Sequence, residues 1–181
     1  MATYSLKKSY QLKNLREINF KDLWGDHGVF TTMWIFGKPA KILFFKNHIK
    51  NLIGSLQIYG VKKKSLHKDI LKIINKNLSK KSYYNHLLRV AVNKNTISIS
   101  LRKKISPKSN FNLKLVNLKR EKPKYKNLKY KKILRHLIKL DNSKSDIGLV
   151  YNKMILETGT SNLLFIKNNK IYTPTKGYYE G

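Results

Sequence analysis

The sequence of 181 residues contains no cysteine and only nine acidic residues. Without cysteine the chain can form no disulfide framework, no thiolate zinc site and no cysteine nucleophile. The shortage of acids leaves a net charge of +30, which excludes an acidic metal-buffering protein. No apolar run reaches the about 18 residues of a membrane span, and the N-terminus lacks the apolar core of a secretory signal. We therefore expect a soluble, cytoplasmic protein.

Arginine is also scarce, because only five of the 39 basic residues are arginine. Arginine recognises phosphates and base edges better than lysine, since its planar group makes paired hydrogen bonds. Lysine, asparagine, isoleucine and tyrosine are abundant together, which is typical of an AT-rich genome. The lysines are scattered along the sequence, and no nucleic-acid-binding motif accompanies them. We interpret the positive charge as a consequence of the amino-acid composition, with the lysines on solvated surfaces. We therefore expect no nucleic-acid partner. A basic nucleic-acid-binding protein remains the alternative.

The apolar pattern of the first part of the chain predicts helices packed against an antiparallel sheet, which is an α+β arrangement. The predicted strands cover residues 28–36, 42–45, 87–92, 96–101 and 111–118. The predicted helices cover about 48–59, with Asn47 as N-cap, and a segment that begins at Ser65.

A polar segment with Pro123 at residues 119–125 predicts a linker between two domains, 1–118 and 126–181. Beyond it the pattern predicts one helix and four short strands. The helix covers 130–140, and the strands cover 147–151, 154–157, 162–167 and 170–173.

One ordered series of residues in the second part carries chemical information. The segment Lys126-Asn127-Leu128-Lys129-Tyr130 follows the linker, and Glu157 comes 31 residues after Lys126 in the run LETGTSNLLF. Thr173-Pro174 completes the series. It resembles the fold-type IV pyridoxal-phosphate enzymes, which include branched-chain and D-amino-acid aminotransferases and 4-amino-4-deoxychorismate lyases. The segments GDHGVFTT at 25–32 and HIKNL at 48–52 are also similar to this family.

The resemblance implies a two-domain class IV aminotransferase-like fold. Its N-terminal domain would be an α/β two-layer sandwich, and its C-terminal domain an incomplete α/β barrel-like domain. The implied cofactor is pyridoxal 5'-phosphate, with no metal. The implied reaction is transamination of a branched-chain or D-amino acid, or elimination from aminodeoxychorismate. The family also implies a homodimer.

The resemblance assigns roles to particular residues. Lys126 would bond to the cofactor aldehyde and move the substrate proton, and the nearby Lys124 and Lys129 would favour its neutral form. Glu157 would keep the cofactor's pyridine nitrogen protonated. Thr160 and Ser161 would supply hydrogen-bond donors to the cofactor. Tyr130 would either hydrogen-bond the cofactor's ring oxygen or simply pack.

The sequence also departs from the family pattern. Asn51 stands where the family has an arginine on the cofactor phosphate, so hydrogen bonding is kept but the charge is lost. Trp34 replaces an arginine that often faces the substrate. The family pattern continues with a further lobe, whereas this sequence ends at Tyr179-Glu180-Gly181. We therefore predict weak cofactor binding. The alternative hypothesis is that the protein is a catalytically decayed or truncated homologue.

Overall fold

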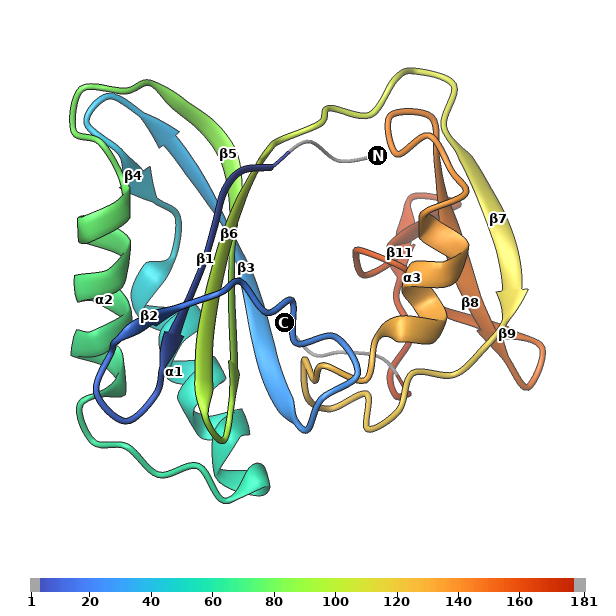
Figure 1. Ribbon diagram of the computed structural model, residues 1–181. Helices are drawn as coiled ribbons and strands as arrows, with labels where there is room; N and C mark the ends of the chain where they lie inside the picture. Colours follow the sequence, from blue (N-terminus) through green and yellow to red (C-terminus); the bar gives the residue numbers. More distant parts are fainter. Residues whose placement is uncertain (1–3, 178–181) are drawn as a thin grey trace. The chain divides into compact units, whose positions relative to one another are not determined.

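The computed structural model of the chain describes residues 4–177 (Figure 1). The chain divides into two compact units between Lys104 and Ile105. This differs from the expected boundary at residue 118. The reason is that β7 (Asn112–Asn117) pairs in parallel with β8 (Ser145–Tyr151), so it belongs to the second unit together with the predicted linker. Tyr179-Glu180-Gly181 lies outside the described residues.

The first unit is built on a six-stranded antiparallel sheet with the strand order β2-β1-β6-β5-β3-β4. The strands are β1 (Tyr4–Gln11), β2 (Glu17–Ile18), β3 (Gly28–Gly37), β4 (Lys41–Ile42), β5 (Tyr84–Asn93) and β6 (Thr96–Lys103). The predicted hairpin of β5 with β6 is confirmed. The predicted pairing of β3 with the following strand is also present, but β4 ends at Ile42 and Phe45 belongs to the next helix, so the strand expected at 42–45 is wrong in its extent. Strands β1 and β2 were not predicted.

Two helices and a short 3-10 turn cover one side of this sheet (Figure 1). They are α1 (Phe45–Leu56), η1 (Gln57–Tyr59) and α2 (Leu66–Asn77). Their apolar residues join those of the strands in one buried core. The start of α1 differs from the prediction, because its cap is Phe44 in a left-handed conformation, and Asn47 lies inside the first turn. Ser65 precedes α2 as predicted, but its hydroxyl donates to Asp69 at 2.8 Å and not to the backbone.

The segment between β2 and β3 is fixed to polar side chains of the first sheet. Arg89 lies between the core residues Val90 and Leu88, so strand alternation points it to the face opposite the helices. Its guanidinium donates to the carbonyl of Asp22 at 2.8 Å and to the carboxylate at 2.5 Å. The ring of Trp24 lies 4.2 Å from the guanidinium carbon. These contacts hold the segment to the sheet and keep Arg89 buried.

The second unit contains a three-stranded sheet, one helix and a separate hairpin. The sheet has the order β7-β8-β9, with β9 (Met154–Thr158) antiparallel to β8. The helix is α3 (Lys131–Leu137), and the hairpin joins β10 (Phe165–Lys167) to β11 (Lys170–Tyr172). All four strands predicted after the linker are present, and the mixed α+β class is confirmed. Within the described residues no helix is long and apolar enough to cross a membrane.

Candidate active site

The backbone around Lys126 is fixed by the two residues that follow it. The side-chain amide of Asn127 donates to the carbonyl of Glu121 at 2.7 Å, and its oxygen accepts from the backbone N–H of Lys129 at 3.0 Å. Leu128 is completely buried. An amide that bonds both sides of a loop leaves that loop few alternative conformations. Lys126 is therefore presented from a rigid segment just before α3, although the segment has no regular structure.

A buried ion pair joins this segment to the end of β9. The guanidinium of Arg120 donates to both carboxylate oxygens of Glu157, at 2.7 and 3.1 Å. The two side chains are 7% and 3% exposed, so the pair is almost fully removed from water. Burial by itself would lower the pKa of Arg120, but the hydrogen bonds and charge of Glu157 outweigh it and raise that pKa above its ordinary value. The guanidinium of Arg120 therefore keeps its charge inside the protein.

The charges of Arg120 and Glu157 both act on the Lys126 amine. Burial of the amine and the positive charge of Arg120 lower its pKa to about 8, while the negative charge of Glu157 opposes the shift. Arg120 is a cation that the sequence did not indicate, and a contribution of Lys124 and Lys129 to the neutral amine stays a prediction. With this pKa about one Lys126 amine in ten is neutral at pH 7, against fewer than about one in a thousand for an exposed lysine.

The ring of Tyr130 packs against the guanidinium group of Arg120. Its ring centroid lies 5.0 Å from the guanidinium carbon, and its hydroxyl donates a hydrogen bond to the carbonyl of Gly159. Burial is the main reason that its pKa is raised to about 12, so the phenol keeps its proton at physiological pH. Tyr130 therefore connects the ion pair to the turn that follows β9.

The turn at residues 158–161 is held together by its own hydroxyl groups. The Thr158 hydroxyl donates to the carbonyl of Ser161 at 3.0 Å. The same oxygen accepts from the backbone N–H groups of Thr160 at 3.1 Å and Ser161 at 2.7 Å. Two backbone donors of the turn are thus already used inside it.

Asp146, at the start of β8, fixes the same turn from outside. Its buried carboxylate accepts from the Thr160 hydroxyl at 2.5 Å and from the backbone N–H of Ile147 at 2.7 Å. A Cβ atom at Gly159 would lie only 2.8 Å from this carboxylate, so no larger residue fits there without movement. A hydroxyl has one proton to donate. The expected Thr160 hydroxyl donor is therefore already committed to Asp146, and it can offer a ligand only its lone pairs.

The structure brings most of the predicted site residues together, with one exception. Lys126, Tyr130, Glu157, Thr160 and Ser161 all lie in the second unit, around Arg120 and the turn. Asn51 lies in the first unit, exposed on α1. Its carbonyl accepts from the Ser55 hydroxyl at 2.8 Å. On the same helix, the Nδ1 atom of His48 shares a 2.9 Å hydrogen bond with the Thr31 hydroxyl.

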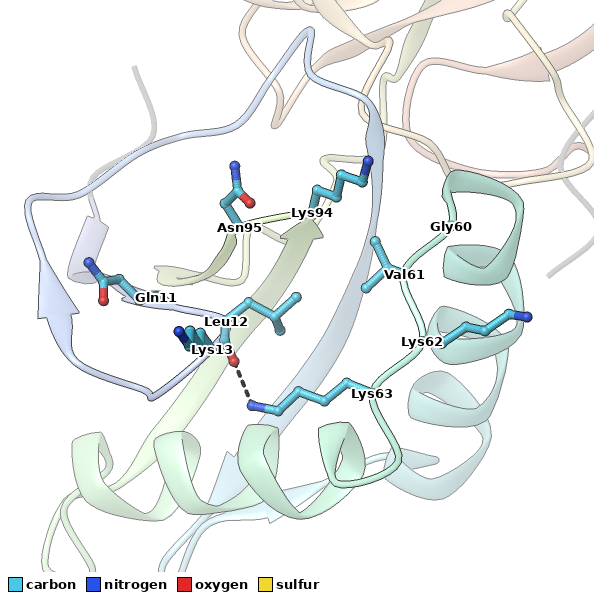
Figure 2. A pocket seen from close by; sticks show the side chains of 9 residues that line it. All are labelled: Gln11, Leu12, Lys13, Gly60, Val61, Lys62, Lys63, Lys94 and Asn95. Atoms are coloured by element: carbon cyan, nitrogen blue, oxygen red, sulfur yellow. Dashed lines mark hydrogen bonds between the residues drawn. The ribbon is translucent and has the colours of Figure 1, made fainter.

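A hollow of about 510 Å³ in the first unit contains none of the predicted site residues (Figure 2). Three segments line it: residues 11–13, 60–63 and 94–95. Figure 2 shows the Lys63 amine reaching the carbonyl of Leu12, at 2.5 Å. Lys63 therefore holds two loops of the fold together. The chemistry implied by the sequence is not located in this hollow.

The model of the family described as amino-transferase class IV matches residues 28–181. This match spans most of the chain, including the segments that hold Lys126 and Glu157. The chain belongs to the class IV amino-transferase family. Among curated proteins, none matches the sequence significantly.

Solved structures of other class IV proteins have the same fold. The T.th. branched-chain amino acid aminotransferase superposes with a TM-score of 0.73 at 14% identity, over 99% of this chain and 71% of that chain. A Legionella pneumophila protein assigned as a 4-amino-4-deoxychorismate lyase gives 0.63 at 21% identity, over 86% and 65%. A Mycobacterium tuberculosis protein, solved in its PLP-bound form, gives 0.62 at 12% identity, over 97% and 74%. The expected class IV fold is therefore confirmed.

Three residues of the cluster were not predicted from the sequence. Arg120 was placed in the linker, Asn127 was read only as part of the lysine segment, and Asp146 was not considered. A signal existed for two of them, because arginine and acidic residues are rare in this chain. In a sequence with many lysines, a charged residue of a rare type is a good candidate for a buried ion pair.

Proposed function

We propose that this class IV protein uses pyridoxal 5'-phosphate to process an amino acid or aminodeoxychorismate. The observation that carries the proposal is the Lys126 amine, whose pKa is lowered to about 8 beside the buried pair of Arg120 and Glu157. An amine with a lowered pKa and a buried carboxylate in the same unit are the two groups that this cofactor needs. The donor set therefore fits pyridoxal phosphate.

Each group has a distinct task in the proposed site. When bound, pyridoxal phosphate supplies an electron sink for the carbon from which a proton is removed. Lys126 would hold the cofactor covalently and would move a proton as a general base and acid. Glu157 would keep the pyridine nitrogen protonated. Arg120 orients Glu157 through hydrogen bonds to both of its carboxylate oxygens. Tyr130 and Asp146 position the turn at residues 158–161.

The similar structures favour two reactions, transamination of a branched-chain amino acid and elimination from aminodeoxychorismate. Transamination of a D-amino acid is included because of the sequence resemblance alone. A homodimer in the cytoplasm belongs to the same proposal. Two observations support weak cofactor binding and a reduced activity as the second candidate. Asn51 offers no charge to a phosphate, and the Thr160 hydroxyl proton is already donated to Asp146.

The decisive experiment is borohydride trapping of pyridoxal phosphate on the full chain, followed by peptide mapping. With 34 lysines present, the label must be supplied below one equivalent and the modified residue identified. At pH 8 about half of the Lys126 amines are neutral, against fewer than about one in a hundred for an exposed lysine with an ordinary pKa. We expect the label to lie mainly on Lys126.

The matched variants are Lys126→Arg and Lys129→Arg, which keep the charge at two neighbouring positions. Lys126→Arg should abolish the selective label, and Lys129→Arg should keep it. A label spread over surface lysines in all three proteins would refute the proposed role of Lys126.

A further inference from the structure

The lysines that are scattered in the sequence gather on the outer face of the helix layer of the first unit. Lys68, Lys72 and Lys76 recur every four residues along α2, and all three are exposed. Four residues advance about 6 Å along a helix and return to nearly the same side, so they form a row. Lys64 precedes the helix and Lys80 follows it, and both are exposed. We call these five residues the lysine row.

Almost no negative charge balances this surface. Asp69 is the only acidic residue between positions 27 and 120 of the sequence. It is engaged by Lys63 at 2.9 Å and by the Ser65 hydroxyl, and Lys63 is not part of the row. Glu17 approaches Lys76 at 3.8 Å, but its main partner is Lys8. Within the described residues, the other members of the lysine row have no acidic partner in an ion pair.

An exposed aromatic ring lies just beyond the row. The connection from α2 to β5 carries Lys80, Lys81 and Tyr83, and Tyr83 is 73% exposed. The backbone N–H of Ser79 donates to the Tyr84 hydroxyl at 2.9 Å, which anchors this connection to the sheet. The connection thus presents the exposed ring of Tyr83 close in sequence to Lys80 and Lys81.

We infer that the lysine row and Tyr83 form a binding surface for single-stranded nucleic acid. The lysines neutralise consecutive phosphates, and the Tyr83 ring stacks on an unpaired base. Lysine is sufficient for this contact, because phosphate neutralisation requires charge and not the paired hydrogen bonds with which arginine reads bases. The surface is therefore independent of sequence, and it is separate from the Lys126 cluster, which belongs to the other unit.

The composition of α2 favours a nucleic acid over an anionic membrane. A helix that binds a membrane surface inserts its apolar face into the lipid. In α2 that face is already used, since Leu66, Ile70, Ile73 and Ile74 are buried in the core. A double helix would leave Tyr83 without an unpaired base to contact.

The hollow lined by residues 11–13, 60–63 and 94–95 is a less suitable site for nucleic acid than the lysine row. Figure 2 shows the Lys62 side chain pointing away from the hollow, and the Lys63 amine is bound to the Leu12 carbonyl. Leu12 and Val61 supply apolar side chains to its lining. The positive charge is thus displayed outward, along the helix surface.

The test is fluorescence anisotropy of a labelled oligothymidylate of about 20 nucleotides with the full chain, at salt concentrations from about 50 to 200 mM. The triple variant Lys64→Gln, Lys68→Gln, Lys72→Gln should weaken binding at least about tenfold at the lowest salt. It should also make the slope of log affinity against log salt shallower by about 2, since each phosphate contact contributes about 0.7. Tyr83→Ala should weaken binding about tenfold, and Tyr83→Phe should not.

The matched control removes the same charge elsewhere, through Lys114→Gln, Lys139→Gln and Lys144→Gln, three exposed positions of the second unit. It should reduce the affinity much less than the first triple. Equal losses would mean that net charge alone binds the oligonucleotide, and would overturn the inference. It would also be overturned if the chain failed to bind, or if it bound only to vesicles containing phosphatidylserine. Both variants need circular dichroism to show an unchanged fold.

Discussion

The two units of this protein differ in how completely they bury their apolar side chains. In the first unit, the helices and the sheet share one buried core that includes Val29, Ile49, Ile70 and Ile99. In the second unit the β10–β11 hairpin exposes its apolar residues, with Ile166 and Ile171 at 77% and 69%. A hollow of about 410 Å³ between β9 and the hairpin is bordered by Leu156 and Phe165.

The difference shows that the candidate site is not built on the better-packed half of the molecule. The cluster around Lys126 is held by hydrogen bonds, a buried ion pair and a few apolar anchors, while apolar residues nearby remain uncovered. Exposed apolar surface of this kind is typical of a face that packs against further polypeptide. The chain spans 71% and 65% of the lengths of two of the similar structures.

The largest expected effect comes from separating the units. A fragment of residues 1–104 should fold and unfold cooperatively on heating, because its core is complete within the unit. A fragment of residues 105–181 should unfold at a lower temperature and should bind more of a hydrophobic dye, because it leaves more apolar surface exposed. Circular dichroism and dye fluorescence measure both properties. Equal melting temperatures and equal dye binding of the two fragments would remove the contrast between the units.

The next largest effect comes from breaking the buried ion pair. Arg120→Met should lower the free energy of unfolding of the second unit by about 3–5 kcal/mol, since it leaves Glu157 charged and unpaired. The double variant with Glu157→Leu should recover much of this loss. Urea denaturation followed by a probe in the second unit measures the change. Lys8→Gln, which breaks an exposed pair, is the control and should have no measurable effect. An equally small effect of Arg120→Met would contradict the role given to the pair.

A smaller effect concerns pH. The pKa of Lys126 is about 8 in the folded chain and about 10.4 in an unfolded chain, so the unfolded state binds more protons between these values. Burial of the charged amine therefore destabilises the fold below pH 8, and this penalty disappears as the pH rises to about 10.4. The stability advantage of Lys126→Met over the native chain should shrink across that window. Denaturation curves at several pH values test this, and a constant difference would show that Lys126 has an ordinary pKa.

The smallest effect is expected for Tyr130→Phe. The variant keeps the ring beside Arg120 but removes the hydroxyl that donates to Gly159. We expect a loss of about 0.5–1.5 kcal/mol, which is the usual net contribution of one hydrogen bond. Hydrogen exchange of the turn at residues 158–161 should increase at the same time. Unchanged exchange would mean that Asp146 alone fixes the turn.

Much of the fold could be predicted from local patterns. The apolar spacing of α2 is strong because the helix buries one side in the core. β5 and β6 are rich in branched apolar residues because most of their positions are buried. Strand β1 was missed because lysine, serine and tyrosine dominate it, and its pairing with β6 is a long-range contact. The start of α1 was misplaced because the left-handed Phe44 carries no capping signal.

The candidate site was only partly predictable. Lys126 and Glu157 could be proposed from the ordered series that they share with the class IV family. The rarity of arginine and acidic residues marks Arg120 and Asp146, but their partners could not be predicted, because these lie 37 and 14 residues away and are brought near only by folding. A local pattern describes neighbours along the chain, whereas buried charges are matched across it.

The Arg120–Glu157 pair has a consequence for how the sequence can evolve. Each residue is tolerable in the interior only while the other is present, so a lineage that loses one of them inherits an unmatched charge. Descendants of this protein should therefore keep both residues or replace both together, and a single change should persist only beside a second one that compensates for it.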